Sequence, residues 1–71
     1  MDLEASFRRL GPRLYRYALA LTGSPPDAEE AVQDAFVSLA EAKSPPRDET
    51  GWLLTAVRHA AIKKAGRTRR C

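Results

Sequence analysis

The 71-residue sequence is poor in the side chains from which metal and redox sites are usually built. It has one cysteine, Cys71, and one histidine, His59. A single thiol excludes a disulfide within the chain and a zinc site built on cysteines. Glu30 and Asp34 are spaced like paired carboxylates on a helix, but no histidine or third acid accompanies them to hold a metal. We therefore expect no catalytic residues, metal or cofactor, and predict that the chain is not an enzyme.

Long apolar runs are also absent. No stretch approaches the roughly 20 apolar residues that a membrane-spanning helix requires. The opening residues, MDLEASF, carry acids where a secretory signal has a positive flank. A composition of 44% hydrophobic and 30% charged residues is typical of a water-soluble folded domain. We therefore expect a cytoplasmic protein without membrane contact, folded as a single domain over residues 1–71.

Strand signals are missing, and the proline pairs mark two breaks. These are GSPPD at 23–27 and KSPPRD at 43–48, and no alternating β-branched run accompanies them. The fold class is therefore predicted to be all-α, a compact three-helix bundle. The predicted segments are a first helix in 1–22, a second in 24–42, a loop at 43–48, a third helix in 49–66 and a basic tail at 67–71.

Each helical segment has apolar residues at steps of three and four, which places them on one face of a helix. Ser24 and Asp48 are predicted N-caps, Pro12 predicts a kink or short break in the first helix, and Gly66 is predicted to end the third. The predicted core residues are Leu3, Phe7, Leu10, Leu14, Tyr17, Ala18 and Leu21 in the first segment, Ala28, Val32, Ala35, Phe36 and Leu39 in the second, and Leu53, Ala56, Val57, Ala60 and Ala61 in the third, with Trp52 at its flank.

Charge is unevenly distributed along the chain. Up to Val57 there are six basic residues and all nine acids, whereas the residues from Arg58 onward include six basic residues and no acid. Such a basic segment is typical of proteins that bind a polyanion, because neutralising phosphates releases condensed counterions. It is equally well explained as a solvated helix end with basic residues that suit the helix dipole.

The outer faces of the second and third segments carry the candidate binding residues. On the second, an acidic strip surrounds an exposed valine and fits a basic partner, although a plain solvated face is the favoured explanation before other observations are added. On the third, Ile62 lies among polar and basic residues, which indicates either a wide buried sector or contact with an unstacked base or sugar. The strip is Glu30, Gln33, Asp34, Val37 and Glu41, and the third segment exposes Thr55, Arg58, His59 and Lys63.

Two motifs resemble region 2 of extracytoplasmic-function (group IV) sigma factors of RNA polymerase. The stretch LYRYALALTGSPPDAEEAVQDAF at 14–36 is similar to the opening of that region, in which a turn leads into an acidic helix. The stretch WLLTAVRH at 52–59 is similar to the family's W-L-x-x-I-A-R-N helix. Both motifs occur in the family's order, and the resemblance extends over nearly the whole chain. Ala31 and His59 depart from the larger aliphatic and the asparagine usual at these positions.

The resemblance implies a transcription initiation module. The acidic helix would bind the β′ clamp helices of RNA polymerase through Glu30, Gln33, Asp34 and Val37. The third helix and the preceding loop would bind the non-template strand of the minus-ten promoter element as single-stranded DNA. The DNA-binding residues implied in this way are Lys43, Ser44, Arg47, Arg58, His59, Ile62, Lys63, Lys64 and Arg67.

Other interpretations remain open at this point. A helical protein–protein interaction module without DNA binding is the alternative, and an anti-sigma factor is a further partner that the resemblance implies. A duplex-reading helix-turn-helix fits less well, because the proline loop is unlike a tight glycine turn. The family carries a second domain that reads the minus-thirty-five element, so we expect the chain to be a fragment of a longer protein.

Overall fold

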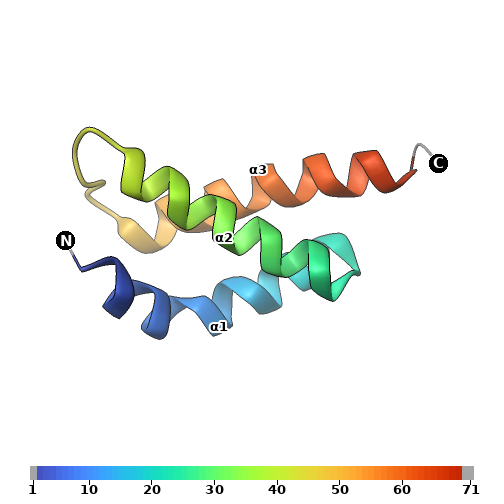
Figure 1. Ribbon diagram of the computed structural model, residues 1–71, viewed down its shortest axis with the longest axis horizontal. Coiled ribbons are helices and arrows are strands. Elements are labelled where there is room, and N and C mark those ends of the chain that lie inside the picture. The colour runs from blue at the N-terminus through green and yellow to red at the C-terminus, as the bar shows by residue number, and fades with distance from the viewer. Residues whose placement is uncertain (1, 70–71) are drawn as a thin grey trace.

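The computed structural model describes the backbone of residues 2–69 and the side chains of residues 2–66. Within this range the chain forms three helices (Figure 1). Helix α1 spans Leu3–Thr22, α2 spans Pro25–Glu41 and α3 spans Glu49–Arg69. Each helix packs against both others, and no strand occurs among residues 2–69. The predicted all-α three-helix bundle is therefore confirmed. Within this range no helix is long and apolar enough to cross a membrane.

The ends of α1 and the start of α2 follow from local chemistry. The backbone N–H of Ala5 donates a hydrogen bond to the Asp2 carboxylate at 3.2 Å, which caps α1. Gly23 ends this helix in the left-handed region with φ 66°, where glycine has no steric penalty. Ser24 then precedes α2, whose first two residues are prolines and therefore lack the donors that a helix start leaves unpaired.

Helix α3 begins as predicted but ends later. The N–H of Gly51 donates to the Asp48 carboxylate at 3.1 Å, so Asp48 caps the helix. Gly66 was expected to stop it, yet α3 continues through Arg69. Gly23 is the residue with positive φ in the described chain, so Gly66 keeps right-handed helical geometry. Glycine inside a helix costs about 1 kcal/mol relative to alanine, which weakens a helix without terminating it.

Helix α1 runs through Pro12 without a break. The apolar residues on both sides of the proline, Leu10 and Leu14, are buried in the same core. Burial of both halves of the helix against α2 and α3 therefore offsets the one backbone hydrogen bond that proline removes. Of the two alternatives considered for Pro12, the short break is not found.

The core is built largely from the predicted stripes. Ala31 is also buried, whereas Phe7 and Leu21 are 48% and 37% exposed although their spacing placed them on the apolar face. Phe7 lies at the edge of the core, where its ring is 5.1 Å from that of Phe36. Ala56 and Ala60 are only partly buried. The buried hydrophobic residues are Leu10, Leu14, Ala18, Ala28, Ala31, Val32, Ala35, Phe36, Leu39, Leu53, Val57 and Ala61.

Candidate protein-binding and nucleic-acid-binding surfaces

The outer face of α2 presents one candidate surface, which we call the α2 strip and define as Glu30, Gln33, Asp34 and Val37. All four are exposed, at steps of three and four residues along the helix. Val37 is 56% exposed, more than any other large hydrophobic side chain in the described chain. An exposed valine within a polar strip is a suitable centre for a protein contact, because covering it removes apolar surface from water.

Two carboxylates of the α2 strip are joined to α3 by Lys64. The Lys64 ammonium donates to Glu30 Oε1 at 2.7 Å and lies 3.2 Å from Asp34 Oδ2. The Lys64 side chain is only 6% exposed, whereas both carboxylates remain more than half exposed. Lys64 was predicted to contact DNA, but this side chain is covered and already paired with acids. The three residues instead form a structural link between α2 and α3.

Helical spacing explains why Lys64 is buried. Leu53, Val57 and Ala61 form the buried stripe of α3 at steps of four, and Lys64 follows three residues later on the same face. This periodicity was available in the sequence, but the basic character of the neighbouring residues outweighed it. The hydrogen bond that Lys64 donates to Glu30 raises the pKa of Lys64. Burial lowers this pKa and so partly opposes the effect, whereas the hydrogen bond to Asp34 and the charge of Asp34 raise it further.

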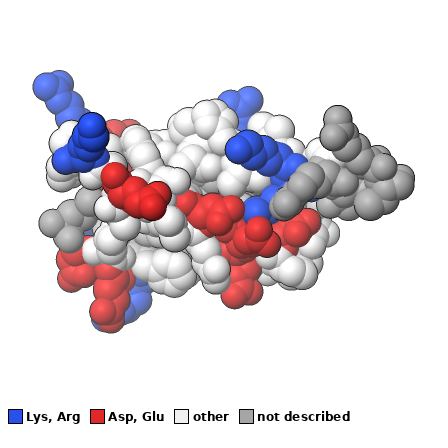
Figure 2. Space-filling model, turned by 45° about the horizontal axis from the view of Figure 1, so that its top comes forward, with Lys and Arg blue, Asp and Glu red and all other residues white. Residues whose placement is uncertain are grey.

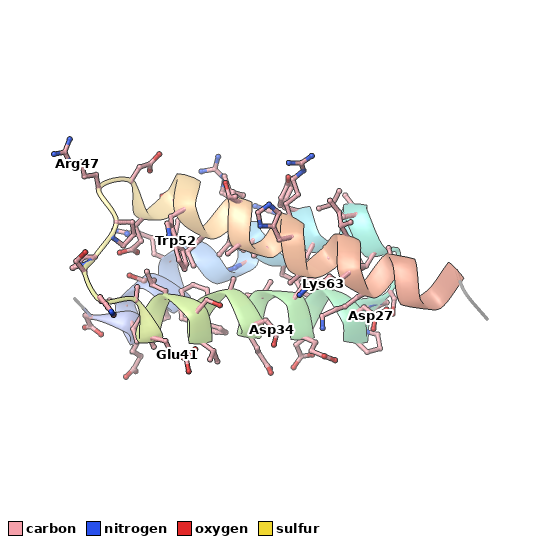
Figure 3. The ribbon with its side chains drawn as sticks, turned by 90° about the horizontal axis from the view of Figure 1, so that it is seen from above. Asp27, Asp34, Glu41, Arg47, Trp52 and Lys63 are labelled. Atoms are coloured by element: carbon pink, nitrogen blue, oxygen red, sulfur yellow. The ribbon has the colours of Figure 1, made fainter. Side chains whose placement is uncertain are left out.

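The outer face of α3 brings together four of the predicted DNA-binding residues. Arg58, His59, Ile62 and Lys63 are all exposed, and Ile62 is 51% exposed. Figure 3 shows Lys63 pointing from α3 towards α2, where it lines a shallow groove with Glu30 and Asp34. The exposed isoleucine between basic side chains therefore does not reflect a wide buried sector.

A hollow lies between the loop and the first turns of α3. It is lined by Pro46 and Arg47 from the loop and by Trp52, Thr55 and His59 from α3, among others. The Asp48 cap fixes the loop to the helix start, and Thr55 donates a hydrogen bond to the carbonyl of Gly51 at 3.0 Å. The Trp52 indole and the His59 imidazole beside this hollow are groups on which a nucleobase can stack.

The remaining predicted residues occupy the loop and the end of α3. Lys43, Ser44 and Arg47 are exposed, and Figure 3 shows Arg47 pointing away from the bundle. The sequence predicted that Arg47 binds DNA but not that it lines one hollow with Trp52 and His59. The position of Arg47 relative to these residues depends on how the loop folds back on α3. The side chain of Arg67 lies outside the described residues.

Charge on the described surface separates into neighbouring regions. In the view of Figure 2 most acidic side chains form a band across the middle and lower part of the molecule, and the visible basic side chains lie mainly above it. The two regions meet at the groove between α2 and α3, where Lys63 and Lys64 adjoin Glu30 and Asp34. No cluster of three metal-ligating side chains occurs among the residues that the structure describes.

Comparison with known proteins gives one match. A family model described as Sigma-70 region 2 matches residues 6–71. No curated protein and no solved structure matches the chain. The family match covers α1 from its fourth residue, α2, α3 and both connecting segments.

Proposed function

The chain belongs to the sigma-70 region 2 family, whose members are non-enzymatic transcription initiation factors that bind RNA polymerase and promoter DNA, and we propose how its two surfaces divide these partners. The α2 strip binds the β′ clamp helices of RNA polymerase. The outer face of α3, with the loop at 43–48, binds the non-template strand of the minus-ten element and assists its melting. We further propose, from the motifs at 14–36 and 52–59, that the chain belongs to the extracytoplasmic-function group.

The observation that carries this proposal is the exposure of both predicted surfaces on one small bundle. Gln33 and Val37 are exposed on α2, and Arg58 and Lys63 are exposed on α3, so each set is accessible while the core is formed by other residues. Had Val37 been buried, α2 would have had no apolar contact to offer. The hollow beside Trp52 and His59 adds a place of suitable chemistry for an unstacked base.

Within the α2 strip we assign the contact mainly to Gln33 and Val37. Lys64 already neutralises part of the charge on Glu30 and Asp34, so these carboxylates contribute long-range attraction to basic clamp residues rather than the desolvated centre. Central, desolvated side chains usually dominate the affinity of a protein interface. Val37 occupies that position here.

The first prediction therefore concerns Val37. Val37→Ser should weaken binding to an isolated β′ clamp fragment about tenfold, because loss of a well-packed interface side chain costs more than 1 kcal/mol. Isothermal titration calorimetry with the full chain measures the effect. Leu21→Ser is the matched control, since it also removes exposed apolar surface but lies at the end of α1. Equal affinities for wild type and Val37→Ser would refute the assignment of the α2 strip.

The second prediction concerns α3. Arg58→Gln and Lys63→Gln should each lower the slope of log affinity against log salt by about 0.7 for single-stranded minus-ten DNA, the value expected per lost phosphate contact. Fluorescence anisotropy at several salt concentrations measures this slope. The matched control is Arg8→Gln on α1, where Arg8 pairs with Glu4. Unchanged slopes for both α3 variants would remove this helix from the DNA site.

These two measurements also separate the proposal from its alternative. A helical module that binds only protein would retain the Val37 effect and show no salt-dependent DNA binding at all. An anti-sigma factor bound at the α2 strip would compete with the clamp fragment for the same side chains.

A further inference from the structure

The described arginines and lysines fall into a paired and an unpaired set. Arg8 pairs with Glu4, Arg9 with Glu49, and Lys64 with two carboxylates. Within residues 2–66, the side chains of Arg13 and Arg16 on α1 make no ion pair or hydrogen bond, and both are exposed. The proposed DNA surface is likewise made of cations without such partners on α3 and in the loop. Arg13 and Arg16 therefore have the electrostatic character of a phosphate-binding surface.

Arg9, Arg13 and Arg16 form one stripe along α1, because steps of four and three residues repeat the same helix face. No acidic residue occurs between Glu4 and Asp27, so nothing on this helix after its first turn offsets the positive charge. A helix face that served solubility alone usually mixes both signs of charge. The charged residues of this stripe are instead all positive over two turns of the helix.

The stripe lies on the side of α1 that borders α3. Arg9 is 3.5 Å from Glu49 at the first residue of α3, whereas the hollow between α1 and α2 is lined by Phe7, Gly11 and Tyr15. Helices α1 and α3 run in the same direction from the same end of the bundle (Figure 1). The Arg9–Glu49 contact therefore brings Arg16 about level with the third turn of α3.

Arg58 belongs to that third turn, and helical spacing places it on the other side of the buried stripe Leu53, Val57 and Ala61 from Trp52, His59 and Lys63. The groove and the hollow on the α2 side of α3 are lined by Trp52, His59 and Lys63, whereas Arg58 lines neither. Arg58 therefore occupies the flank of α3 that is turned towards α1. Arg13 and Arg16 on α1 and Arg58 on α3 are thus exposed cations on flanks of two helices that pack together, on the side of α3 away from the acidic α2 strip.

We propose that Arg13 and Arg16 of α1 extend the DNA-binding surface of α3 by binding phosphates of the same promoter DNA. This inference rests on the proposed function of α3. The acids Glu30 and Asp34 repel phosphates on the α2 side of Lys63. A DNA backbone bound at Arg58 is therefore expected to continue across α1. Contacts of this kind supply affinity and position without reading base identity.

The test compares single substitutions in the full chain. Arg13→Gln and Arg16→Gln should each reduce the salt slope of binding by about 0.7 if the contacted phosphates are single-stranded, or by about 0.9 if they belong to duplex DNA. Two labelled DNAs distinguish these sources, one a minus-ten single strand and one the same strand joined to a duplex. The reduction in salt slope should be the same for a DNA of scrambled sequence. Arg8→Gln is the matched control because it removes the same charge from the α2 side of α1.

Each outcome decides the inference. Reduced slopes on either DNA, with the slope restored in Arg16→Lys, support it. Slopes for Arg13→Gln and Arg16→Gln that equal wild type, while Arg58→Gln lowers the slope, overturn it and leave the proposed function standing. If Arg58→Gln and Lys63→Gln also leave the slope unchanged, the proposed DNA-binding function of α3 itself fails. Because both α1 arginines are exposed and make no ion pair, we expect unchanged thermal midpoints, which circular dichroism verifies.

Discussion

The surroundings of the Lys64 side chain differ most from those predicted from the sequence. It lies in a run of basic residues that suggested DNA contact, yet its ammonium is held by Glu30 and Asp34 and its aliphatic stem continues the buried stripe of α3. A buried charge of this kind stabilises a fold only through its partners, because desolvation opposes it. Its substitution therefore tests packing and pairing separately.

Lys64→Met should leave the free energy of unfolding within about 1 kcal/mol of wild type, since methionine fills the space and the two freed carboxylates are more than half exposed. Lys64→Glu should cost about 3 kcal/mol or more, because it places three acids around a covered site. Urea unfolding followed by circular dichroism measures both. A Lys64→Glu variant as stable as Lys64→Met would show that the ion pairs do not form.

The pairing of Lys64 also predicts a dependence of stability on pH. The hydrogen bond that Lys64 donates to Glu30 raises the folded-state pKa of Lys64. The stabilisation from this pairing is therefore fully present below the unfolded pKa, about 10.4 for lysine, and is lost as the pH rises through the folded value. The stability of wild type relative to Lys64→Met should therefore be constant near neutral pH and decrease above about pH 10. A difference in urea midpoints that stays flat into that range would contradict this.

At the scale of single helices, Gly23 and Gly66 show that glycine can either end a helix or lie within one. Gly23 adopts φ 66° and ends α1, whereas Gly66 lies within the right-handed helix α3. A Cβ added at Gly66 meets no atom within 4 Å. The sequence placed a glycine near the end of two predicted helices but did not distinguish a terminating glycine from one inside a helix.

Gly66→Ala should therefore stabilise the protein by about 0.5–1 kcal/mol, through the lower conformational entropy of the unfolded chain and the better helix propensity of alanine. Gly23→Ala is the matched comparison and should destabilise it by about 1 kcal/mol, because alanine is strained at positive φ. Thermal melts should shift by a few degrees in opposite directions. A lower midpoint for Gly66→Ala would indicate that α3 ends near residue 65.

At the scale of the whole molecule, charge organises two surfaces on a bundle with a small core. Acidic residues gather on α2, and cations without acidic partners occupy α1, α3 and the loop. The surfaces meet at the groove that Lys63 shares with Glu30 and Asp34, so they adjoin rather than lie on opposite sides. Negatively charged DNA is favoured on the side of Lys63 that faces away from Glu30 and Asp34, and a partner attracted by the acids is favoured on α2.

The sequence by itself determined the helices, their approximate limits, most of the core and the family resemblance. It could do so because apolar residues at steps of three and four, proline pairs and capping residues act locally. The exposed positions of Gln33, Val37 and Arg58 followed from the same periodicity.

Only the tertiary structure decided which charges remain available for partners. Lys64 pairs with two residues that lie thirty or more positions earlier in the chain, and Arg9 pairs with Glu49 on another helix. The hollow beside His59 likewise forms only when the loop folds back onto α3. Ion pairs and hollows depend on distances between helices, which no periodicity along one helix contains.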